Sequence, residues 1–180
     1  MAPENYIESA WFEFERYKIL GDKTFSQLSE QELQWRYSPT DNSIAQIVKH
    51  ISGNMLSRWT NFLTEDGEKP WRQRENEFIE PLSKKSEIIS SWQQGWDCLF
   101  NALNQIDNEN FHNVIKIRNE AHTLVEAMNR QLAHYAHHVG QIVLLGKMIK
   151  GSKWKTLSIP RGGSDAFNRQ KFNDGMSTEN

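Results

Sequence analysis

The prediction of the fold starts from the stretch Gln131-Leu-Ala-His-Tyr-Ala-His-His-Val-Gly-Gln141. The stretch lies within a region of helical periodicity that ends near residue 150. The region begins at Thr123-Leu-Val-Glu126, which fits a capping box, a pattern that satisfies backbone donors at a helix start. His134 and His138 are four residues apart, so on this helix they share one face.

That face should be the buried one, yet polar groups interrupt it. Steps of three and four along the helix give Leu124, Ala127, Gln131, His134, His138, Gln141, Leu145 and Met148. The ends of this series are apolar and its middle is polar. Each buried polar group must find a partner or cost roughly 1–3 kcal/mol. A metal ion is the simplest common partner for two imidazoles.

Three further segments show helical periodicity, at about residues 4–23, from Ser43 to about residue 62, and at about residues 83–106. Ser43-Ile-Ala-Gln46 is a second capping box. Only Val114-Ile-Lys-Ile117 alternates as a strand would, and one short strand does not make a sheet. We therefore predict an all-α four-helix bundle.

The connector at about residues 65–82 is long and polar, and it contains Pro70 and Pro81. A connector of this length can cross the whole bundle, so the second and third helices could run parallel. After Gly151 the pattern changes, and we predict a non-helical C-terminal tail. Residues 1–172 are expected to form one domain that includes this tail, and residues 173–180 are expected to be disordered.

Composition narrows the classes of function. The 180 residues include 21 basic and 23 acidic side chains, a net charge of -2, so a nucleic-acid partner is not expected. No apolar run approaches the ~18 residues of a membrane span, and no signal peptide is recognisable. The single cysteine, Cys98, excludes an intrachain disulfide framework and favours a reducing compartment. We expect a cytoplasmic protein without a membrane partner.

His50 provides a third candidate ligand, on the apolar face of the second helix and near Asn54. Together with His134 and His138 it would give three nitrogen ligands, which leave coordination positions open for water or substrate. Neutral imidazoles suit zinc, nickel, copper or ferrous iron. We expect zinc or nickel, with iron or manganese as alternatives. A metal-free alternative is a buried histidine cluster whose hydrogen bonds come only from amide side chains.

Two segments carry a family resemblance, Asp41-Asn-Ser-Ile-Ala-Gln-Ile-Val-Lys-His50 and Asn129-Arg-Gln-Leu-Ala-His-Tyr-Ala-His-His-Val-Gly-Gln-Ile142. They resemble the DinB/YfiT-like superfamily of metal-dependent proteins. With the tail Trp154-Lys-Thr-Leu-Ser-Ile-Pro-Arg-Gly-Gly-Ser164, the chain is similar to a branch of bacterial proteins of unknown function. The resemblance implies a bundle of up-down-down-up topology, commonly a homodimer, with a divalent metal on His50, His134 and His138.

Characterised relatives in that superfamily use low-molecular-weight thiols. The resemblance therefore implies a metal-dependent enzyme that acts on a small molecule, such as a thiol-dependent S-transferase in detoxification, or a hydrolase. The alternative is a non-catalytic, metal-stabilised dimeric protein of interaction or stress response. No motif for binding a thiol cofactor can be assigned, so substrate, reaction and catalytic residues stay open.

Three residues outside the histidine set are candidates for a pocket. Gln141 could fix one imidazole, because a ligand histidine usually donates its second ring nitrogen, and Asn54 is a similar candidate. Arg161 could close over the pocket and hold an anionic substrate group. The alternatives are ordinary interhelical hydrogen bonding for the amides and surface or dimer packing for the arginine.

Overall fold

The structure is a computed structural model that describes residues 3–79 and 81–176. Within these residues the chain is mostly helical, with seven α-helices and a small two-stranded sheet, so the prediction of a predominantly helical protein is confirmed. The long helices are α1 (Pro3–Phe25), α3 (Ile44–Trp59), α5 (Lys85–Leu103) and α6 (Leu124–Lys150). The shorter elements are α2 (Glu30–Leu33), α4 (Asn76–Ile79), β1 (Val114–Ile117), β2 (Glu120–Thr123), the 3-10 helix η1 (Gly151–Lys153) and α7 (Ser164–Met176).

Both predicted capping boxes are present at the starts of the helices that carry the histidines. At the start of α3, Ser43 Oγ accepts from the Gln46 amide, and the Gln46 side chain accepts from the Ser43 amide at 2.9 Å. Thr123 and Glu126 exchange the equivalent pair of hydrogen bonds at the start of α6. These caps fix where each helix begins and therefore which residues face the core.

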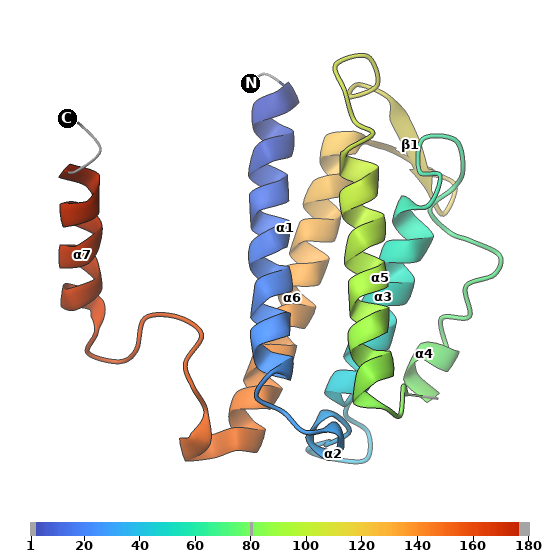
Figure 1. Ribbon diagram of the computed structural model, residues 1–180. Helices are drawn as coiled ribbons and strands as arrows, with labels where there is room; N and C mark the ends of the chain where they lie inside the picture. Colours follow the sequence, from blue (N-terminus) through green and yellow to red (C-terminus); the bar gives the residue numbers. More distant parts are fainter. Residues whose placement is uncertain (1–2, 80, 177–180) are drawn as a thin grey trace.

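The four long helices pack side by side around a common core. α3 packs against α5, and α1 packs against α6 (Figure 1). The two pairs are joined by contacts of α3 with α6 and of α1 with α5. α3 and α5 run in the same direction, because residues 60–79 return along the length of the molecule (Figure 1). The two helices approach closely at Gly95, where an added Cβ would lie 2.9 Å from the Cα of Ser52.

A β-hairpin joins α5 to α6 in place of the single strand expected from the alternating residues 114–117. β1 pairs with β2 in antiparallel register, and Arg118 and Asn119 form the turn with φ values of 56° and 61°. The Asp66 carboxylate accepts from the amides of both turn residues, at 2.8 and 2.7 Å. β2 was missed because its side chains are mostly exposed and do not alternate between buried and exposed positions.

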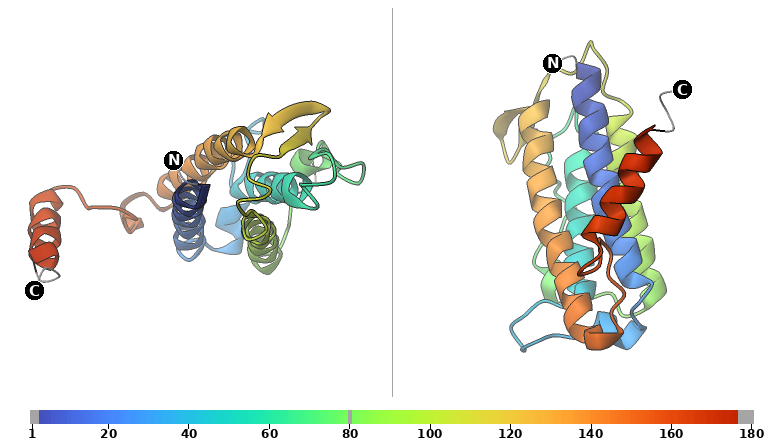
Figure 2. Two further views of the ribbon diagram at one scale, coloured as in Figure 1. Left: turned by 90° about the horizontal axis from the view of Figure 1, so that it is seen from above. Right: turned by 90° about the vertical axis from the view of Figure 1, so that its left-hand side faces the viewer.

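The prediction of a non-helical tail is wrong from Ser164 onward. Residues 154–163 contain no helix, but α7 follows and stands apart from the four long helices (Figures 1 and 2). Hydrophobic periodicity could not reveal α7, because side chains 164–173 are all exposed and the helix has no apolar face. Residues 173–176, expected to be disordered, belong to α7, and residues 177–180 lie outside the described residues.

No helix in the described ranges has the combination of length and hydrophobicity needed to cross a bilayer.

Candidate metal centre

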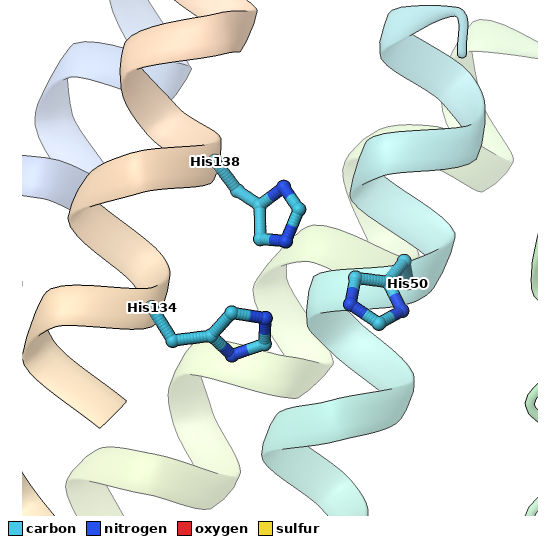
Figure 3. Close-up of side chains that lie close together, drawn as sticks. All are labelled: His50, His134 and His138. Atoms are coloured by element: carbon cyan, nitrogen blue, oxygen red, sulfur yellow. The ribbon is translucent and has the colours of Figure 1, made fainter. Parts of the chain in front are cut away.

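Three histidine rings converge between α3 and α6. His134 and His138 project from α6 toward His50 on α3 (Figure 3). One ring nitrogen from each residue lies within 4.8 Å of the other two. The ring centroids are 4.7 Å apart for His134 and His138, and 5.0 and 5.4 Å from His50 to His138 and His134. The structure therefore brings together the three histidines selected from the sequence.

Burial keeps two of these rings neutral. Loss of contact with water lowers the pKa of His134 to about 3, and the positive charges of neighbouring histidines and arginines act in the same direction. Burial also lowers the pKa of His138 to about 4, against the effect of a hydrogen bond to Gln141. Both imidazoles are thus neutral at pH 7 and keep the nitrogen lone pair that metal coordination requires.

Glu77 holds the third ring through a hydrogen bond to one of its nitrogens. Its carboxylate lies 2.8 Å from His50 Nδ1 and accepts two hydrogen bonds from Arg72, at 2.8 and 3.0 Å. Burial alone would raise the pKa of the Glu77 carboxyl, but the hydrogen bonds from His50 and Arg72 outweigh it and lower that pKa. With Nδ1–H donated to a carboxylate, His50 keeps Nε2 as a free acceptor.

Sequence analysis missed Glu77 and Arg72. Both lie in the connector between α3 and α5, where no periodicity marks a buried position, yet their side chains are only 7% and 2% exposed. Only the return of this connector along α3 brings them to His50. A buried carboxylate behind a candidate histidine ligand is a common arrangement at metal sites.

Gln141 lies beside His138, with its Oε1 atom 2.8 Å from His138 Nδ1. An amide oxygen can only accept, so His138 donates from Nδ1 and Nε2 is left as an acceptor. Two of the three rings are therefore held in the same tautomer, each with Nε2 available. The local reason is the spacing within α6, which places residue 141 one turn after residue 138.

The structure places Asn54 in the wall of a cavity beside two of the histidines, and it places Arg161 outside that cavity. Asn54 accepts from the Tyr135 hydroxyl at 3.1 Å and does not hold an imidazole, although it lines a cavity of about 260 Å³ beside His50 and His134. Arg161 is exposed and does not line this cavity, because the segment after η1 leads away from the long helices toward α7 (Figure 1). The expected closure by Arg161 is therefore absent from the structure.

The amides alone do not satisfy the histidine cluster. Gln141 bonds one ring and Asn54 bonds Tyr135, while the buried Oε1 of Gln131 has no hydrogen-bond partner among the described residues. The three imidazoles, at least two of them neutral, form a donor set that could hold a metal ion.

Comparison with known families identifies the family of this chain. The family described as "Protein of unknown function (DUF1572)" matches residues 2–163. The chain belongs to the DUF1572 family. The matched region of this DUF1572 protein includes the three histidines, Glu77 and Gln141, and it ends one residue before α7. The comparison with curated proteins gave no match.

The low pKa values predict that the metal-free DUF1572 protein loses stability as the pH falls. In the unfolded chain a histidine titrates near pH 6.5, whereas the folded rings of His134 and His138 bind protons only near pH 3 and 4. Below about pH 6.5 the unfolded chain therefore binds more protons, which favours unfolding by up to about 1.4 kcal/mol per pH unit and histidine.

Urea denaturation in the presence of a chelator, at several pH values between 7.5 and 4.5, measures this loss. The His134→Gln/His138→Gln variant should show a flatter dependence of unfolding free energy on pH than the wild type. Equal slopes for the two proteins would mean that these rings are not held neutral by the fold.

Proposed function

We propose that this DUF1572 protein binds one divalent metal ion through His50, His134 and His138. The observation that carries the proposal is the convergence of three ring nitrogens within 4.8 Å of one another. The Nδ1 contacts of His50 with Glu77 and of His138 with Gln141 support it, because they leave Nε2 of both rings as an acceptor for a metal. Zinc or nickel suits this donor set best, and iron or manganese is the alternative.

We also propose that the four long helices form a DinB/YfiT-like bundle of up-down-down-up topology. The directions of α1, α3, α5 and α6 in Figure 1 support this assignment, as does the origin of the histidines on the second and fourth long helices. A cytoplasmic homodimer is part of the same proposal. Phe12 and Ile19, exposed at 60% and 40% and seven residues apart on α1, suit an interface between two copies.

The proposed activity is thiol-dependent transfer to a small electrophilic molecule. A divalent metal with three protein ligands supplies Lewis-acid chemistry, which lowers the pKa of a bound water or thiol. Glu77 and Gln141 would keep the ligand rings oriented, and the cavity of about 260 Å³ beside His134 would receive the small molecule. The partly buried walls of that cavity would limit the access of water to the reacting groups.

Cobalt(II) substitution tests the metal site and the thiol separately. Metal-free protein with one equivalent of cobalt should develop visible absorption bands, and His134→Ala/His138→Ala should not. Addition of 2-mercaptoethanol should then produce a sulfur-to-cobalt charge-transfer band, because a coordinated thiol loses its proton. A cobalt spectrum that does not respond to the thiol would favour the non-catalytic alternative, and the lack of any spectrum would refute the metal site.

A further inference from the structure

Arginine side chains surround the cavity next to the candidate metal centre. The cavity has a volume of about 260 Å³, and His50 and His134 form part of its wall. Its arginines come from four separate parts of the chain: α3, the segment before α4, the turn of the β-hairpin, and α6. They are Arg58, Arg72, Arg74, Arg118 and Arg130. Among the described residues no carboxylate lines the cavity.

Two of these arginines are buried in the cavity wall. The Arg58 and Arg72 side chains are 6% and 2% exposed. Arg72 pairs with Glu77, whereas Arg58 donates to the Gly67 carbonyl and lies 3.4 Å from Glu68. Burial lowers the pKa of the Arg58 guanidinium, and the like charges of Arg72 and Arg118 lower it further, against the opposite effect of Glu68. Positive charge is therefore concentrated here at an energetic cost.

The other three arginines are exposed and keep donors available. Arg118 bonds Glu68 through Nε at 2.9 Å, which leaves its two terminal nitrogens without a hydrogen bond to any described residue. Arg130 lies 3.4 Å from His122 Nε2 and pairs with no carboxylate in the described ranges. Arg74 makes a 3.3 Å contact with Glu75, whose side chain is 82% exposed. Such exposed pairs contribute little to stability, so these guanidinium groups can exchange partners readily.

Gln131 adds an uncharged polar side chain to the wall of the arginine-lined cavity. The residue is 2% exposed and lines the cavity, and its Oε1 atom has no hydrogen-bond partner in the described part of the chain. A buried acceptor without a partner costs free energy that a ligand donor, such as a hydroxyl group, would recover.

We propose that this cavity binds a small molecule through a phosphate or polycarboxylate group. Guanidinium groups from several directions match the oxygens of such an anion, with which arginine forms charge-assisted, often bidentate hydrogen bonds. The whole chain has a net charge of -2, whereas the charged residues that line this cavity are all arginines or histidines among the described residues. As a substrate assignment the inference rests on the proposed function, because the anion would hold the reacting group beside His134.

Calorimetric titration of the metal-free full-length protein with inorganic pyrophosphate and, separately, with citrate tests the inference. Arg118→Gln/Arg130→Gln removes two exposed guanidinium groups of the cavity. Arg16→Gln/Arg161→Gln is the matched control, because it removes two exposed arginines that do not line the cavity. The cavity variant should bind the preferred anion at least about tenfold more weakly than the wild type, and the control should change affinity little.

Tighter binding of pyrophosphate would support a phosphate-bearing ligand, and tighter binding of citrate a polycarboxylate. The inference is overturned if neither anion binds, or if both double variants bind the preferred anion as the wild type does. Zinc loading, measured in a separate experiment in which zinc is added back to each of these proteins, separates this result from the metal proposal. The cavity variant should load zinc normally, and failure of the wild type to load zinc would refute the metal site alone.

Discussion

Zinc added to the metal-free protein should raise its melting temperature by roughly 5–10 °C at a free concentration of about 100 times the dissociation constant. A ligand that binds only the folded state stabilises it by about 2.7 kcal/mol at that concentration. For a chain of 180 residues, each kcal/mol corresponds to about 2–4 °C. The two ligands on α6 and the one on α3 would be joined through the ion, which the unfolded chain cannot reproduce.

The His134→Ala/His138→Ala variant should lose this shift and carry no zinc when purified without an affinity tag. Each variant is compared with and without zinc, so a change in the stability of the metal-free state does not affect the result. His112→Ala/His137→Ala is the matched control, since neither residue belongs to the three-histidine cluster. Equal zinc content in the wild type and the His134/His138 variant would remove the assignment of the ligands.

Replacement of Glu77 by glutamine should have the second large effect, a loss of about 3–5 kcal/mol of unfolding free energy. The Arg72 side chain is 2% exposed and would keep its charge without its carboxylate partner. The His50 ring would also lose the carboxylate at Nδ1, which should weaken zinc binding by about 10–100-fold. Urea denaturation and competition with a zinc chelator measure the two effects.

Glu75→Gln serves as the control, because this neighbouring carboxylate is 82% exposed and should change stability little. Adding Arg72→Gln to Glu77→Gln should restore part of the lost stability, since the uncompensated charge is then removed as well. If Glu77→Gln unfolds at the same urea concentration as the wild type, the buried ion pair does not hold the connector against α3.

The parts of the site that could be predicted from the sequence are those governed by local geometry. The spacing of His134 and His138 sets them on one face of α6, and the capping boxes at Ser43 and Thr123 fix the starts of both histidine-bearing helices. His50 could be selected because it follows Ile47 by three residues, within the series of apolar residues that the sequence of α3 shows at helical spacing. The assignment of these residues as metal ligands remains a proposal.

The rest depends on contacts between distant segments. Glu77 and Arg72 meet His50 only because the connector after α3 folds back along that helix. Sequence analysis expected an arginine at the pocket and selected Arg161, whereas the cavity takes its arginines from four other parts of the chain. No local period relates residues 58, 72, 118 and 130, so only the tertiary structure could identify them.

α7 has a consequence for the design of experiments on this protein. The family match stops at residue 163, and in the thirteen-residue helix α7 the side chains of residues 164–173 are all exposed. An isolated helix of this length gains little stability in water from intrinsic propensity alone. α7 therefore contributes almost nothing to the free energy of cooperative unfolding. It offers an attachment point for a fluorophore or surface tether that leaves the histidine cluster undisturbed.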